Sequence, residues 1–320
     1  MEDAKYLEGV RELDIGEMKE HMGNARRNLA YVLLICGGLL IISYLLTNFG
    51  IISPIWFTIL AMGMAIACYA AYRFIGESSA KKYKSYVMPR IAQMLGAEII
   101  FDPKRHVSLD VFLSSKIFLD RVDVFEGEDY FSGKVGETRI EFSEVDAKQR
   151  KEVKKSDGNR GYEYVTIFKG VFFLADFNKN FNGTTLVLPD SAESLLGNML
   201  GSFVQSKNFQ RPPLAKLEDP EFEKYFVVYS TDQIEARYIL SPSMMDRITT
   251  FRKKAKVKVY LSFIDNKLMI ALPSNKNLFE PGSIVSGFDK KMLDDAANDL
   301  SLIIGIVKDL DLNTRIWSKN

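Results

Sequence analysis

The stretch between Arg27 and Arg73 contains no Asp, Glu, Lys, Arg or His and consists mostly of apolar residues and glycine. A helix that crosses a membrane needs about 20 apolar residues, because it rises about 1.5 Å per residue and the hydrocarbon core is about 30 Å thick. The stretch is too long for one span and suits two, separated at Gly50 and Pro54. We therefore expect a transmembrane helical hairpin, with spans over residues 29–49 and 55–74.

The charges that flank this hairpin predict its orientation. Arg26 and Arg27 precede the first span, Arg73 and three lysines over residues 81–84 follow the second, and the connecting loop is uncharged. Positive residues near span ends stay on the cytoplasmic side. Both termini are therefore expected in the cytoplasm.

The spans themselves exclude one class of function. Neither contains an ionisable residue, which the proton or ion path of a transporter or pump usually requires,. Small residues such as Gly37, Gly38 and Gly63 allow close helix packing,. That packing is expected within the hairpin, and contacts in a homo-oligomer are the alternative.

Composition limits what the rest of the chain can do. The formal net charge of +1 argues against a general nucleic-acid binder, whose surface is usually strongly basic,. The two cysteines, Cys36 and Cys68, lie inside the expected spans, so no disulfide framework or thiol metal site is expected outside them,. No P-loop, nucleophile elbow or paired-histidine motif is present,. We expect no cofactor and no metal.

The order of the predicted elements indicates an α+β fold with antiparallel strands. A surface helix is expected within residues 1–28, a juxtamembrane helix within 75–96, and a cytoplasmic α+β domain over 97–320. A linker at 210–220 either divides that domain into two subdomains or is a connection inside one. Ser230 resembles the start of a capping box, and residues 148–160 are expected to form a charged loop. Strands are predicted at 130–135, 138–142, 162–177, 184–188, 225–229, 256–264 and 267–272, and helices at 79–95, 109–118, 192–205, 233–240, 242–254 and 289–308.

Few residues suggest chemistry. Asp176 stands between apolar neighbours on a predicted strand, where a charge must face outward or find a partner,. Glu235 and Arg237 lie on a predicted helix. An ion pair or a cap explains each of the three better than catalysis does. An enzyme with a carboxylate-based site would need a pocket that joins Asp176 to Glu235 or Arg237.

An apolar segment at residues 192–204 is the candidate interaction site. It presents a broad apolar face, and an exposed face of that kind usually marks a binding surface. The alternative is a helix that packs on the sheet of its own domain. The candidate contact residues are Leu195, Leu196, Met199, Leu200 and Phe203.

Two stretches are distinctive together: residues 167–179 (IFKGVFFLADFNK) and residues 228–242 (VYSTDQIEARYILSP). With Glu128-Asp129-Tyr130 and the sequence LFEP at 278–281, they resemble a bacterial family of membrane-anchored proteins known only as a domain of unknown function. The resemblance implies a protein of the bacterial inner membrane whose relatives are often encoded near LemA-like membrane proteins. It implies no activity, cofactor or catalytic residue.

These features together indicate a membrane-anchored scaffold or adaptor without enzymatic activity. The membrane is the expected partner of the hairpin, and a LemA-like membrane protein is a candidate protein partner. The alternatives are a membrane-tethered enzyme with a carboxylate-based site and a β domain that binds lipid headgroups. The last would use a basic face, for which residues 148–155 and 252–258 are candidates,.

Overall fold

The computed structural model describes residue 10 and residues 16–154, 160–177, 181–190, 211–280 and 290–312. Two long apolar helices precede an antiparallel eight-stranded sheet with shorter helices, so the predicted α+β class is confirmed. The chain divides into two compact units. The first unit contains Met1–Ile91 and Phe279–Ala297, and the second contains Ala92–Leu278 and Asn298–Asn320.

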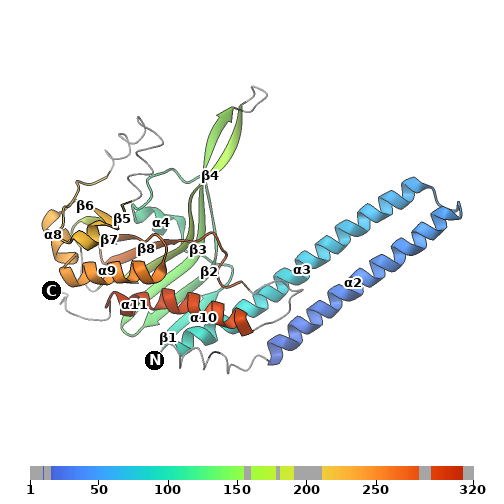
Figure 1. Ribbon diagram of the computed structural model, residues 1–320, viewed down its shortest axis with the longest axis horizontal. Helices are drawn as coiled ribbons and strands as arrows, with labels where there is room; N and C mark the ends of the chain where they lie inside the picture. The colour runs from blue at the N-terminus through green and yellow to red at the C-terminus, as the bar shows by residue number, and fades with distance from the viewer. Residues whose placement is uncertain are drawn as a thin grey trace. The chain divides into compact units, whose positions relative to one another are not determined.

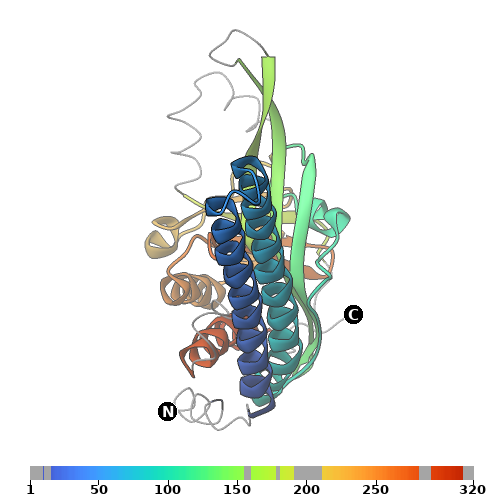
Figure 2. The ribbon, with the colours of Figure 1, turned by 90° about the vertical axis from the view of Figure 1, so that its right-hand side faces the viewer.

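Two long helices, α2 (Gly16–Asn48) and α3 (Pro54–Met94), run side by side in the first unit (Figures 1 and 2). In the turn between them Gly50 has a φ of 72°, a left-handed conformation that glycine adopts without strain,. Length and composition make both helices candidates for membrane spans. Many of their apolar side chains are exposed, including Leu34, Ile35, Ile42, Ile66 and Phe74 at 56% to 76%.

Outside the apolar stretches the same two helices form a stalk, which we define as residues 16–29 of α2 and 75–94 of α3. Met18 and Met22 of α2 are buried, and Leu29 packs in a cluster with Ile75 of α3. Both helices run unbroken from the apolar stretch into the stalk. The surface helix expected before the first span and the juxtamembrane helix expected after the second are therefore continuations of α2 and α3.

The end of α3 holds a distant part of the chain. The Tyr83 hydroxyl donates a hydrogen bond to the Met292 carbonyl at 3.3 Å. Lys84, only 3% exposed, forms an ion pair with Glu280 at 2.5 Å. A buried ammonium group must be paired, because its desolvation is otherwise unfavourable. The second half of α3 thus anchors the segment around residues 280–292 in the first unit.

Acid is expected to weaken the stalk through His21. Its Nδ1 lies 3.5 Å from Lys82 Nζ. Burial, and then the charge of Lys82, lower the pKa of His21 below 6.5, against an opposing effect of Glu17. Because the pKa is lower in the folded state, the stability that His21 contributes is present above about pH 6.5 and is lost as the pH falls through the folded-state pKa. The melting temperature of the detergent-solubilised chain should therefore fall less on acidification in His21→Gln than in the wild type, and an equal fall would contradict this role.

The second unit contains one sheet, in the order β1-β2-β3-β4-β8-β7-β5-β6, in which every neighbouring pair is antiparallel. Figure 1 shows helices α9 and α11 lying across one side of this sheet. The strands are β1 (Ala97–Asp102), β2 (Val124–Val135), β3 (Thr138–Lys154), β4 (Arg160–Asp176), β5 (Thr184–Pro189), β6 (Phe226–Ser230), β7 (Tyr260–Ile264) and β8 (Lys267–Pro273). The shorter helices are α4 (Leu109–Ser114), α7 (Pro220–Glu223), α8 (Gln233–Ile239), α9 (Pro242–Ala255), α10 (Lys290–Ile304), which begins in the first unit, and α11 (Ile306–Asp309).

The core lies on both faces of the sheet, because alternate residues of a strand point to opposite faces. On one face Phe112 of α4 packs on Phe172 of β4, with ring centroids 5.1 Å apart. On the other face the neighbouring Phe173 stacks on Phe142 of β3, and Phe142 stacks on Phe131 of β2. The central strands are therefore buried on both sides, which explains their aromatic and β-branched sequences.

Several local predictions are confirmed. Ser108 caps α4, and Ser241 caps α9 by accepting a hydrogen bond from the Met244 amide. The hairpin predicted across Asp265-Asn266 joins β7 and β8. The helix expected at 289–308 is also present, although it is divided into α10 and α11 at Gly305.

Two local predictions are wrong. The N-cap of α8 is Asp232 and not Ser230, since the Asp232 carboxylate accepts from the amides of Ile234 and Glu235. Residues 148–160 are not simply a charged loop, because β3 extends to Lys154 and β4 begins at Arg160. A strand at β1 was not expected from the sequence. Residues 192–205, for which a helix was predicted, lie outside the described residues.

Candidate functional site

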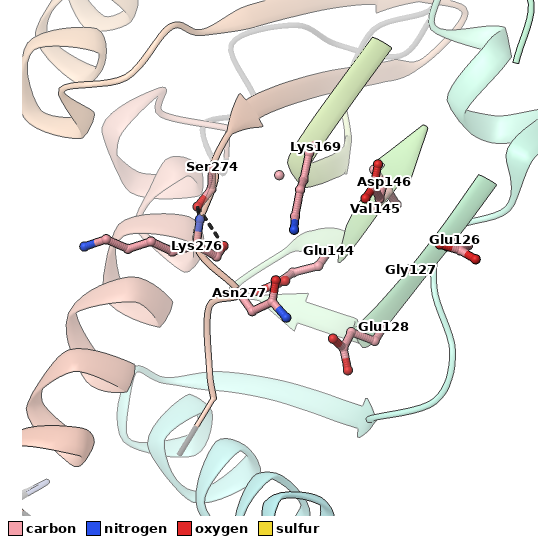
Figure 3. A pocket seen from close by; sticks show the side chains of 11 residues that line it. Glu126, Gly127, Glu128, Glu144, Val145, Asp146, Lys169, Ser274, Lys276 and Asn277 are labelled. Atoms are coloured by element: carbon pink, nitrogen blue, oxygen red, sulfur yellow. Dashed lines mark hydrogen bonds between the residues drawn. The ribbon is translucent and has the colours of Figure 1, made fainter. Parts of the chain in front are cut away.

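A polar cavity of about 290 Å³ opens over β2, β3 and β4, beside the chain that follows β8 (Figure 3). Carboxylates and lysines line it together with the amide of Asn277. In Figure 3 the Lys169 side chain points into the hollow toward Glu144, whereas Lys276 points away. The lining residues are Glu126, Gly127, Glu128, Glu144, Val145, Asp146, Lys169, Gly170, Ser274, Lys276 and Asn277.

The cavity lies where the strands depart from regular pairing. The register between β2 and β3 shifts between Glu128 and Phe131, and Asp129 has a φ of 58°. A bulge of this kind re-aims the side chains around it. At Gly127 an added Cβ would lie 2.3 Å from the Glu144 carbonyl oxygen, so only glycine allows β2 and β3 to approach this closely.

The bulge brings three carboxylates together. Glu128, Asp129 and Glu144 each place one oxygen within 4.8 Å of the others, and both Asp129 and Glu144 are buried. Oxygen ligands of this type suit hard cations such as Ca²⁺ or Mg²⁺. Glu144 also accepts a hydrogen bond from the Leu278 amide at 2.5 Å. One function of the cluster is therefore to hold the chain that leaves β8.

A lysine forms ion pairs beside the cavity. Lys148 Nζ lies 3.0 Å from an Asp146 oxygen and 3.8 Å from a Glu126 oxygen. Its hydrogen bond to Asp146 raises the pKa of Lys148. Asp146, which lines the cavity, is thus partly neutralised by a lysine outside the lining.

The three residues considered for catalysis from the sequence have structural environments. Asp176 is exposed at the end of β4, opposite Lys267. Glu235 is buried and accepts hydrogen bonds from the backbone amides of Asn182 and Gly183. Arg237 donates to the backbone carbonyl of Gln233 in α8 and to that of Lys216, which precedes α7. None of the three lines either cavity described here.

A smaller cavity of about 200 Å³ lies beside the edge strand β6. It is more apolar, with Leu214, Leu217, Phe222 and Phe226 among its lining residues. Leu214 forms a bridge to Tyr229 that extends the sheet edge. The cavity therefore lies between β6, α7 and the chain that precedes α7.

The candidate contact residues Leu195, Leu196, Met199, Leu200 and Phe203 lie outside the described residues. Sequence reasoning missed the carboxylate cluster, although Glu128-Asp129-Tyr130 contributed to the family resemblance. The available signal was two adjacent acidic residues next to Gly127 in a strand, where glycine often marks a bulge. Glu144 could not have been paired with them without the register.

Comparison with known proteins gives a family of unknown function. The model of a family described as protein of unknown function (DUF3137) matches residues 166–312, which agrees with the resemblance seen in the sequence. No curated protein matches the chain. One similar solved structure is the crystal structure of the mycobacterial trehalose monomycolate transport factor A, TtfA, with 10% identity and a TM-score of 0.32 over 69% of this chain and 93% of that chain.

Proposed function

We propose that this protein is a membrane-anchored adaptor, in which α2 and α3 tether the second unit to a bilayer. The observation that supports it is the exposure of the apolar side chains between residues 30 and 74. In water such a surface would be strongly unfavourable, since burying apolar area contributes about 25 cal/mol per Å². Lipid is the environment that suits two adjacent helices with outward-facing Leu, Ile and Phe.

The change in burial along α3 supports a specific membrane boundary. The helix has 41 residues, so it is about 60 Å long, twice the thickness of the hydrocarbon core,. The run of exposed large apolar side chains in the first half of α3 ends at Phe74, where Arg73 and Glu77 form an ion pair at 2.7 Å. Buried stalk residues begin soon after. We infer that the bilayer ends near residue 74 and that the stalk lies outside it.

Two spans would put both termini on one side of the membrane, and the flanking positive charges favour the cytoplasmic side. The proposal therefore places the second unit in the cytoplasm, at an inner membrane. Tethering raises the effective concentration of any partner at that membrane, so a weak binding surface suffices. A LemA-like membrane protein remains the candidate protein partner, and self-association through the small residues of the spans is the alternative contact.

Membrane integration is expected to fail when charge is placed on the lipid-facing surface. Leu39 and Ile66 are exposed near the middle of the two expected spans, so Leu39→Arg with Ile66→Arg should disfavour insertion by about 2.5 to 3.5 kcal/mol per arginine,. The measurement is the fraction of chain that resists alkaline carbonate extraction of host membranes. Leu39→Ala with Ile66→Ala is the matched control and should stay in the membrane. A wild-type chain that carbonate releases would refute the anchor.

The same chain allows a test of orientation. Replacing Cys36 and Cys68 by serine removes both cysteines, and one cysteine can then be placed at Ser53 in the loop or at Ser78 after the second span. A membrane-impermeant maleimide applied to intact host cells should label Ser53→Cys and not Ser78→Cys. The reverse pattern would place the second unit on the outer side.

A further inference from the structure

The far ends of β3 and β4 form a two-stranded ribbon, which we define as residues 149–154 and 160–166. Residues 149–154 pair with 160–165 in antiparallel register, whereas β2 reaches only Lys148 and β8 reaches only Gly170. Among the described residues no third strand pairs with the ribbon. Figure 1 shows it projecting beyond the rest of the sheet.

One face of the ribbon combines aromatic and basic side chains. Residues directly opposite one another share a face of the pair. Arg150 lies opposite Tyr164, Glu152 opposite Tyr162, and Lys154 opposite Arg160. Tyr162 and Tyr164 are 63% and 55% exposed, and the Arg150 guanidinium lies 4.4 Å from the centre of the Tyr162 ring.

The two tyrosines do not contribute to a hydrophobic core. A tyrosine whose ring is more than half exposed on a ribbon without a core contributes little to folding, because it removes little apolar area from water. Tyrosine is well suited to an interface with an apolar side and a wet side. The face therefore has the composition of a binding surface.

The positive charges of this face are only partly neutralised within the ribbon. Arg160 contacts Glu152 at 3.4 Å, but no carboxylate among the described residues pairs with Lys154. The other basic cluster, in the last turns of α9, differs. Lys253 is paired with Glu221, and Lys254 with Asp309. The ribbon therefore has positive charge left for a partner.

We propose that the ribbon is a second membrane contact, which binds anionic lipid headgroups through Arg150, Lys154 and Arg160 while Tyr162 and Tyr164 enter the interface. This inference rests on the proposed membrane anchor, and it identifies anionic lipid as the partner of the ribbon. Interfacial tyrosine beside lysine and arginine is the composition that favours the boundary between water and an anionic bilayer. Each basic residue near such a surface raises binding roughly fivefold.

Tethering explains why so small a patch suffices. A surface with three basic residues and one acidic residue would hold a free protein weakly on a membrane. A unit anchored to the same bilayer meets the headgroups at a high effective concentration, so the contact becomes intramolecular. Nucleic acid is the competing partner, but it is favoured by a strongly basic domain, and this chain has a net charge of only +1.

The test uses the full chain in lipid nanodiscs. In a Cys36→Ser, Cys68→Ser background, Thr166→Cys at the base of the ribbon carries a polarity-sensitive fluorophore. Discs of phosphatidylcholine alone are compared with discs of equal phosphatidylcholine and phosphatidylglycerol. We expect a blue shift, with quenching by spin-labelled lipid, in the anionic discs only. At about 1 M salt the screening length falls to about 3 Å and the response should disappear.

A charge-matched pair of variants assigns the effect to the ribbon. Lys154→Gln with Arg160→Gln removes two positive charges from the proposed face and should weaken the contact roughly 25-fold. Lys253→Gln with Lys254→Gln removes the same charge from α9 and should leave it unchanged. Tyr164→Ser tests the aromatic part separately and should reduce the blue shift, and circular dichroism checks that each variant is folded.

The outcomes separate this inference from the anchor. A chain that fails to enter any disc overturns the proposed anchor and this contact with it. A chain that enters both kinds of disc but gives the same signal in each overturns the lipid contact alone. Equal loss in the ribbon pair and the α9 pair, or a response to added polyuridylate in neutral discs that exceeds the response to anionic lipid, also overturns it. If the variant with Lys154→Gln and Arg160→Gln does not fold, the wild-type chain still tests the lipid contact. Its signal is then compared between the two kinds of disc and between low and high salt.

Discussion

Replacing Gly170 with valine should destabilise the second unit by about 3 kcal/mol or more, because it combines backbone strain with overpacking. Gly170 has a φ of 147°, which residues with a side chain rarely adopt. An added Cβ would lie 2.2 Å from the Leu272 carbonyl oxygen and 2.6 Å from the Ser274 amide nitrogen. These are backbone atoms of the neighbouring strand, so they cannot move aside without breaking the β4–β8 pairing.

Thermal unfolding of the detergent-solubilised chain, followed by circular dichroism, measures this effect. Gly76→Ala is the matched control, since Gly76 lies in helix α3 and an added Cβ meets no atom within 4 Å. Alanine in a helix is favoured over glycine by up to about 1 kcal/mol, so the control should be neutral or slightly stabilising. A Gly170→Val variant that melts with the wild type would mean that β4 and β8 do not approach each other as described.

Replacing Glu235 with alanine should lower stability by about 2 to 4 kcal/mol. The two carboxylate oxygens accept hydrogen bonds from the amides of Asn182 at 3.0 Å and Gly183 at 2.8 Å. The side chain is buried, so its removal leaves two amides without an acceptor beside the start of β5. For a domain of this size the melting temperature should fall by about 4 to 16 °C.

Asp176→Asn is the control for Glu235, because sequence reasoning placed both carboxylates in the same class. Asp176 is exposed, and exposed ion pairs are worth at most about 1 kcal/mol,. Glu235→Gln, which keeps one carbonyl oxygen, should lie between the alanine variant and the wild type. Equal melting temperatures for Glu235→Ala and Asp176→Asn would show that the carboxylate does not hold the turn.

The strands and their turns were largely predictable, for a local reason. Residues 162–177 were expected to form one long bent strand or two, and all but the last of them lie in the single strand β4, with Gly170 at an unusual φ. Asp265 and Asn266 are residue types that favour turns, and they stand between two apolar runs. The turn between β7 and β8 forms at these residues. In both cases the signal lies within a few residues of the structure that it specifies.

The cap of α8 and the ribbon were mispredicted because the local sequence is compatible with more than one structure in each case. Ser230 and Asp232 are both good N-cap residues, and only the backbone path decides which carboxylate or hydroxyl reaches the first amides,. Residues 148–154 are as charged as a loop, but strand pairing with the tyrosine-rich partner strand overrides their low β-propensity,. Propensity of this kind is a weak guide once a neighbour supplies the hydrogen bonds.

The sequence by itself determined the two apolar helices and the alternation of strand and helix after them, because composition and periodicity are properties of consecutive residues. Tertiary structure alone decided the polar cavity, in which a bulge in β2 brings Glu128 and Asp129 beside Glu144 of the next strand. It also decided that Glu235 is a buried anchor and Asp176 an exposed charge. The sequence around a carboxylate does not show which distant residues will lie beside it. Its environment therefore follows only from strand register and packing.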